Sequence, residues 1–121
     1  MNAQKRRAVA YIAGRLISGK SAGSVYDYAT SSRYRIYGDV SPGFIQVFDD
    51  DRYSYIIGGA TPEGLSIFDY YTRQHINLKI SGNDFYGYDM ETSSYFSGIV
   101  NKSTVDFFDY QFSRNFRYAI Q

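Results

Sequence analysis

Hydrophobic and polar residues follow two different periods along this chain, and the change falls near residue 24. Between residues 3 and 18, apolar side chains recur at intervals of three and four, which places them on one face of a helix. From Val25 onward, apolar and polar residues alternate with a period of two, which is typical of β-strands. The pattern predicts an amphipathic helix over 3–18, a connector over 19–24 and a β region over 25–121.

The β region is built from five units of about 20 residues. Each unit contains an aromatic residue followed directly by aspartate, and successive aspartates are 22, 20, 20 and 20 residues apart. A constant period of this length indicates one supersecondary unit used repeatedly. In the third unit, alternating stretches lie before and after a turn at 71–74, which predicts a β-hairpin. The five aspartates are Asp27, Asp49, Asp69, Asp89 and Asp109.

Five hairpins in series predict about ten antiparallel strands in a single, mainly β domain over residues 1–121. A long open sheet would leave exposed edges, so we expect an up-and-down barrel or a two-sheet sandwich. The alternation alone does not distinguish these two arrangements. The helix is expected to cover one end or one face of the sheet, and Gly19 is expected to end it, because glycine adopts the left-handed conformation easily.

The aspartates lie on the same strand face as the aliphatic core, at the strand end where the turn begins. An aspartate at this position commonly accepts hydrogen bonds from backbone N–H groups of the turn. We therefore interpret the five aspartates as turn-setting residues. A shared metal site is not expected, because such aspartates on neighbouring hairpins would be about 10 Å apart when a strand lies between them.

The aromatic residue before each aspartate lies on the opposite face of its strand. If equivalent strands align, these side chains form a row across the sheet. The row contains Tyr26, Phe48, Phe68, Tyr88 and Phe108, flanked by Tyr28, Tyr70 and Tyr110. Two interpretations are open: the rings form a second core beneath the helix or another part of the sheet, or they line a groove for a sugar, a cationic head group or a partner chain.

Charge is distributed unevenly, although the formal net charge is only +1. Residues 1–23 contain five basic side chains and no acid, whereas the rest of the chain contains 8 basic and 12 acidic side chains. A basic leader of this kind is a candidate for binding an anionic partner, which could be nucleic acid, lipid head groups or the acidic body itself. The favoured interpretation is a helix docked on its own domain with its basic face in solvent. We do not expect nucleic acid as the partner, because the acidic body would repel it. The candidate anion-binding residues are Lys5, Arg6, Arg7, Arg15 and Lys20.

Candidate catalytic motifs are weak in this sequence. Residues 14–21 match the P-loop pattern, but that motif needs a buried strand before it and a helix after it, and here a predicted helix precedes it. His75 is the only histidine, there is no cysteine, and no carboxylate pair indicates acid–base chemistry. We therefore expect no enzymatic activity, no cofactor and no metal.

The repeat unit resembles the YD repeats of large polymorphic toxins. The resemblance rests on Tyr26-Asp27 followed by Arg33-Tyr34, and it covers residues 24–121 in outline. It implies a shared hairpin rhythm rather than a shared function, and the turns here lack the usual glycine. Choline-binding repeats are aromatic hairpins of similar size, but they use tryptophan, which is absent here.

Tyrosine is the most informative residue for function, with 14 copies in 121 residues. Tyrosine is enriched in protein interfaces because it gives a large contact area at low entropic cost. We expect a non-enzymatic binding module whose partner is another protein or a second copy of this chain. The alternatives are a barrel that binds a carbohydrate or lipid-like ligand, and nucleic-acid contact through the basic helix. No apolar stretch is long enough to span a bilayer, and we expect a cytoplasmic protein.

Overall fold

The computed structural model describes all residues from 1 to 121 and contains one helix and ten strands. The helix α1 spans Ala3–Ser18. The strands are β1 (Ser24–Asp27), β2 (Ser32–Ser41), β3 (Phe44–Asp49), β4 (Ser54–Thr61), β5 (Gly64–Asp69), β6 (Gln74–Ser81), β7 (Asp84–Asp89), β8 (Ser94–Asn101), β9 (Thr104–Asp109) and β10 (Arg114–Ile120).

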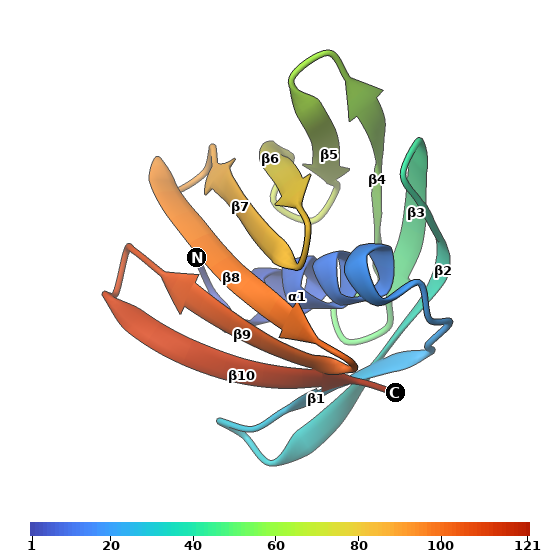
Figure 1. Cartoon of the computed structure of the whole chain (residues 1–121), viewed down its shortest axis with the longest axis vertical. Coiled ribbons are helices and arrows are strands. Elements are labelled where there is room, and N and C mark those ends of the chain that lie inside the picture. Colours follow the sequence, from blue (N-terminus) through green and yellow to red (C-terminus); the bar gives the residue numbers. More distant parts are fainter.

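The ten strands form a closed up-and-down barrel. Each strand pairs in antiparallel fashion with its neighbours in sequence, and β1 closes the barrel by pairing with β10, where Val25 faces Ile120 (Figure 1). This arrangement confirms the mainly β fold with five hairpins, and it shows that the sheet closes rather than splitting into a sandwich. Closure removes the edges that an open meander would expose.

The helix α1 lies inside the barrel, with strands around it (Figure 1). Every residue from Lys5 to Gly14 is buried, so no side of this segment faces solvent. Of the two placements expected for the helix, an end or a face of the sheet, the structure has the second, and the face that the helix covers is the inner one. The physical reason is barrel size: inward side chains just fill an eight-stranded barrel, whereas a ten-stranded barrel is wider and needs a further filling element.

Both ends of α1 are capped as the local sequence indicates. The side chain of Asn2 accepts a hydrogen bond of 2.8 Å from the backbone N–H of Lys5. Gly19 adopts the left-handed conformation with φ of 70°, and its N–H donates to the carbonyl of Arg15 at 3.0 Å. The predicted end of the helix at Gly19 is confirmed.

The core is the layer between the helix and the barrel wall. Apolar residues of α1, such as Val9 and Ile12, pack against the inward side chains of the strands. The helix and strand residues together form one hydrophobic cluster. The aromatic rings of three phenylalanines contact one another within this layer. The ring of Phe96 is stacked on that of Phe107 with a centroid distance of 5.2 Å, and the ring of Phe85 is tilted against that of Phe107 at 5.7 Å. The aliphatic strand face predicted to be core is therefore packed on the helix.

Glycines on the inward face let neighbouring strands approach closely. A Cβ added at Gly58 would lie 2.2 Å from the carbonyl oxygen of Ser66, and one at Gly98 would lie 2.3 Å from that of Asp106. These distances are far below van der Waals contact, so only glycine fits. Inward glycines of this kind allow strands to bend sharply around a barrel.

The register brings the five repeat aspartates to one end of the barrel. Asp49 faces Ser54 on β4, whereas Asp69 faces Ile56 on the same strand, so the two aspartates are offset by only two positions along β4. The same offset recurs on β6 and β8. Such a stagger tilts the strands relative to the barrel axis.

Candidate functional site

The repeat aspartates form a buried ring inside one end of the barrel. They are the last residues of β1, β3, β5, β7 and β9, and each is at most 2% exposed. In each of them, one carboxylate oxygen accepts a hydrogen bond from the backbone N–H two residues later. The donors are Ala29, Asp51, Tyr71, Glu91 and Gln111, at 2.9–3.3 Å. The predicted turn-setting contacts are therefore confirmed.

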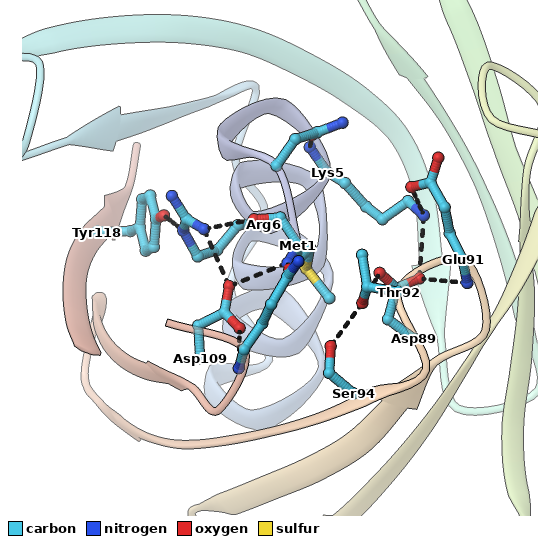
Figure 2. Close-up of polar contacts among 11 residues, drawn as sticks. Met1, Lys5, Arg6, Asp89, Glu91, Thr92, Ser94, Asp109 and Tyr118 are labelled. Atoms are coloured by element: carbon cyan, nitrogen blue, oxygen red, sulfur yellow. Dashed lines mark hydrogen bonds and ion pairs between the residues drawn. The ribbon is translucent and has the colours of Figure 1, made fainter. Parts of the chain in front are cut away.

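The first turns of α1 supply cations to this ring. Lys5 pairs with Asp89 at 3.0 Å, and Arg6 pairs with Asp109 at 3.0 Å (Figure 2). Arg7 pairs with Asp27 at 3.2 Å. Basic residues at a helix N-terminus are normally unfavourable because of the helix dipole, and the surrounding carboxylates offset this cost.

Arg52 completes the ring from the turn after β3. Its guanidinium donates to Asp49 and to Asp69 at 2.8 Å each, and the Arg52 side chain is fully buried. The Met1 amine also lies 3.3 Å from Asp109. Every ring carboxylate thus has a cationic partner within the chain, and Lys5 and Arg7 also pair with Glu91 and Asp51 at the edge of the ring.

These ion pairs change the interpretation of the basic leader. Lys5, Arg6 and Arg7 do not lie on the favoured solvated helix face; they are buried against the chain's own aspartates, which was the other alternative for an anionic partner within the protein. The signal that could have located them was the uneven charge, since the basic leader and the acidic body are complementary. Nothing local in the sequence identified Arg52 as a partner of two aspartates.

The remaining basic candidates lie at the other end of the helix. Arg15 donates to the carbonyl of Gly38 at 2.7 Å and to the hydroxyl of Tyr11 at 3.0 Å. Lys20 is exposed and reaches Ser103 at 3.2 Å. The segment resembling a P-loop therefore spans the C-terminal end of α1, where carbonyl groups rather than N–H groups are free.

Two tyrosines inside the barrel have raised pKa values. Burial raises the pKa of Tyr118 to about 12, although the adjacent Arg6, whose Nε donates to the hydroxyl at 2.9 Å, acts in the opposite direction. Burial also raises the pKa of Tyr11, with Arg15 again opposing the shift. Both hydroxyls stay protonated at neutral pH and act as structural hydrogen-bonding groups.

The aromatic row lies on the outside of the barrel, as its strand face requires. Its five members are half-buried, while Tyr28, Tyr70 and Tyr110 are about half exposed. The helix is on the other side of the wall, so it does not cover these rings. Their partial burial comes from other rings on the outer face, which pack at centroid distances of 4.7–5.0 Å. These pairs are Tyr26–Tyr28, Phe48–Tyr55, Phe68–Tyr70, Phe68–His75, Tyr88–Tyr95 and Phe108–Tyr110.

One groove on this outer surface lies over β2, β3 and β4 and is called here the β2–β4 groove. Its volume is about 990 Å³, and Phe48 of the predicted row is one of its lining residues. Its aromatic wall consists of Tyr37, Phe48, Tyr53, Tyr55 and Tyr70, and its polar residues include Asp39, Gln46, Asp50 and Ser54.

Sequence reasoning found only part of this groove. Phe48 and Tyr70 were candidates because they follow the repeat, whereas Tyr37, Tyr53 and Tyr55 were not. The sequence signal that could have located the groove was that the second unit departs from the repeat at two positions. Asp50 stands where the third and fifth units have Tyr70 and Tyr110, and Tyr53 stands where three other units have serine.

Comparison with known proteins gives no relative from which a function could be inferred, so the fold and the groove are the basis for inferring one. No protein-family model matches the chain, and neither a curated protein nor a solved structure matches it. The one helix, α1, lacks the length and apolar character that crossing a lipid bilayer requires.

Proposed function

We propose that the protein is a non-enzymatic binding module that presents the β2–β4 groove to a protein partner or to a second copy of this chain. The observation that carries this proposal is the groove itself, in which five aromatic side chains line a concave region of the outer wall. Exposed aromatic clusters of this kind are typical of interaction surfaces.

The helix and the ion pairs that fill the barrel lumen support a binding site on the outer wall. The helix α1 occupies the lumen, where a ligand-binding barrel would hold its ligand, and each aspartate of the ring is already paired with one of the chain's own cations. The groove contains Tyr53, which is 79% exposed, and tyrosine contributes contact area with little loss of side-chain entropy.

A carbohydrate is the second candidate ligand for the same groove. It is favoured by the mixture of aromatic faces with the side chains of Gln46 and Ser54, which could hydrogen-bond to hydroxyl groups. A sugar would need fewer contacts than a protein partner, and it would bind without involving a macromolecule.

Affinity capture with a matched pair of variants tests the proposal. Tyr55 and Tyr95 occupy equivalent positions, six residues after their repeat aspartates, and each packs on the aromatic row. Only Tyr55 lines the β2–β4 groove. We expect Tyr55→Ser to lose a partner that wild-type protein and Tyr95→Ser capture from an extract of the native host.

The captured protein is then purified and titrated against both variants, and light scattering over a concentration series detects self-association. Tyr55-dependent binding in either assay supports the proposal. A protein that remains monomeric and captures nothing in a Tyr55-dependent way contradicts it.

A further inference from the structure

The β2–β4 groove combines aromatic rings with two free carboxylates. Asp39 and Asp50 are exposed, and neither takes part in an ion pair, whereas all five aspartates of the buried ring do. The side chains therefore present negative charge next to the π-faces of the groove. Both features attract a cation.

The groove exists because the second unit departs from the repeat. In the third and fifth units, Tyr70 and Tyr110 follow the aspartate and pack edge-on against the row at 4.7 Å. The second unit has Asp50 at this position, and its side chain supplies no ring to pack on Phe48. Phe48 packs instead on Tyr37, Tyr53 and Tyr55, and Asp50 lines the same groove.

Tyr53 adds a wall at a backbone position that does not favour a bulky side chain. Its φ is 52°, in the left-handed region, and equivalent turn positions in other units carry Ser31, Ser93 and Ser113 with similar φ. A large aromatic residue in this conformation is uncommon and costs energy. Its ring packs on Phe48 at 5.3 Å and forms one side of the groove.

The same chain already places guanidinium groups between a ring and a carboxylate. Arg7 lies 3.6 Å from the centroid of Tyr34 and pairs with Asp27. Arg6 lies 3.5 Å from the centroid of Phe116 and pairs with Asp109. The β2–β4 groove has rings and carboxylates, but no guanidinium of the chain pairs with Asp39 or Asp50.

Arg35 lies at the edge of this groove, over Tyr37, but its guanidinium does not lie between a ring and a carboxylate as those of Arg6 and Arg7 do. Its guanidinium carbon lies 4.6 Å from the centroid of the Tyr37 ring, but the side chain forms no ion pair with Asp39 or Asp50. This contact shows that Tyr37, a ring of the groove, can hold a guanidinium that is not paired with either carboxylate.

We propose that the β2–β4 groove binds an arginine side chain on an exposed segment of a partner protein. The guanidinium would lie against the aromatic wall around Phe48 and pair with Asp39 and Asp50. This inference rests on the proposed function and names the chemistry of its partner. Arginine suits the site better than lysine, because its planar guanidinium stacks on rings and pairs with carboxylates together.

Peptide titration of the full chain tests the inference. The probes are tetra-arginine and tetra-citrulline, which have nearly the same shape but differ in charge because a neutral urea replaces each guanidinium, and cellotetraose represents a neutral sugar. We expect tetra-arginine to shift the amide resonances of Tyr53, Ser54 and Tyr55, and tetra-citrulline to bind about tenfold more weakly in calorimetry.

Charge variants identify the site. Asp39→Asn and Asp50→Asn should each weaken tetra-arginine binding about threefold. Asp84→Asn, on the outer face of β7, should leave it unchanged. The β6–β7 pair offers a natural comparison, because Lys79 occupies the position equivalent to Asp39 opposite β7, and its positive charge should exclude the peptide from that surface.

Equal binding of the arginine and citrulline peptides would overturn the inference, as would unchanged binding by both groove variants. Binding of cellotetraose at these residues without binding of tetra-arginine would also overturn it. The proposed function fails separately: a partner captured through Tyr55 but bound equally well by the Asp39→Asn/Asp50→Asn variant supports a binding module and contradicts the arginine chemistry.

Discussion

Arg52 shows how much of this fold depends on single buried charges. Its guanidinium connects the aspartates of two consecutive hairpins, and its side chain has no access to solvent. Removing one partner of a buried ion pair leaves an uncompensated charge in the interior, which costs much more than breaking a surface pair.

Replacement of this residue gives the first prediction. Arg52→Met leaves Asp49 and Asp69 without their cation and should lower the free energy of unfolding by about 3–5 kcal/mol, as measured by urea denaturation. Arg117→Met is the control, because Arg117 pairs with Asp106 at 2.8 Å on the exposed outer wall. Equal stability of the two variants would show that the buried ring does not stabilise the barrel.

Tyr118 gives a prediction for high pH. Its pKa is raised from 10.0 to about 12, so the folded state holds this proton more tightly than the unfolded state. The resulting stabilisation is complete below pH 10 and is lost as the pH rises toward 12. A shift of two pKa units corresponds to roughly 3 kcal/mol.

The measurement compares wild-type protein with Tyr118→Phe by chemical denaturation between pH 9 and 12. Tyr118→Phe removes the acceptor of the Arg6 Nε, so its stability should be lower throughout. The decisive quantity is the slope: the variant should lose less stability than wild type over this range. Parallel curves would contradict the raised pKa.

At the scale of elements, inward-facing glycines allow the strands to bend and pack closely in the barrel wall. The inward glycines stand where the alternating pattern would place a core side chain, and the neighbouring backbone occupies that space. The alternating pattern predicts their inward direction, but the close approach of the adjacent strand depends on how tightly the sheet coils.

Gly58→Ala tests this role. The new Cβ would lie 2.2 Å from the carbonyl oxygen of Ser66 and 2.6 Å from the Cα of Ile67, so the strands must separate. We expect a loss of about 1–3 kcal/mol in thermal or urea unfolding. Gly43→Ala is the matched control, because nothing lies within 4 Å of the added Cβ. A fully stable Gly58→Ala would mean that β4 and β5 can move apart without cost.

At the scale of the whole molecule, the helix and the barrel form one packing unit. The middle of α1 is buried on all sides, and β1 and β10 close the wall around it although they lie at opposite ends of the sheet-forming sequence. Because the helix supplies much of the core, we expect the helix and the barrel to unfold together.

Hydrogen exchange tests this coupling. The amides of Val9 to Ala13 should exchange only through global unfolding, with the same opening free energy as the strand amides of Ile67 and Phe107. A helix docked on the outside would open locally and exchange sooner. Exchange of the helix at a clearly lower free energy than the strands would contradict its position in the lumen.

The sequence by itself determined the features that depend on neighbouring residues. The helix over 3–18, its end at Gly19, the five hairpins and the turn-setting aspartates all follow from spacing and local hydrogen bonding. The outer position of the aromatic row follows from the two-residue alternation of a strand in the same way.

Only the tertiary structure decided what lies inside the barrel and what remains on its surface. The closure of the sheet, the helix in the lumen and the pairing of Lys5 with Asp89 join residues far apart in the chain, and no local period specifies them. The β2–β4 groove likewise depends on Tyr37, Phe48 and Tyr53 being brought together across strands. Barrel geometry, rather than residue spacing, determines these contacts, because the number and stagger of the strands set the width of the lumen.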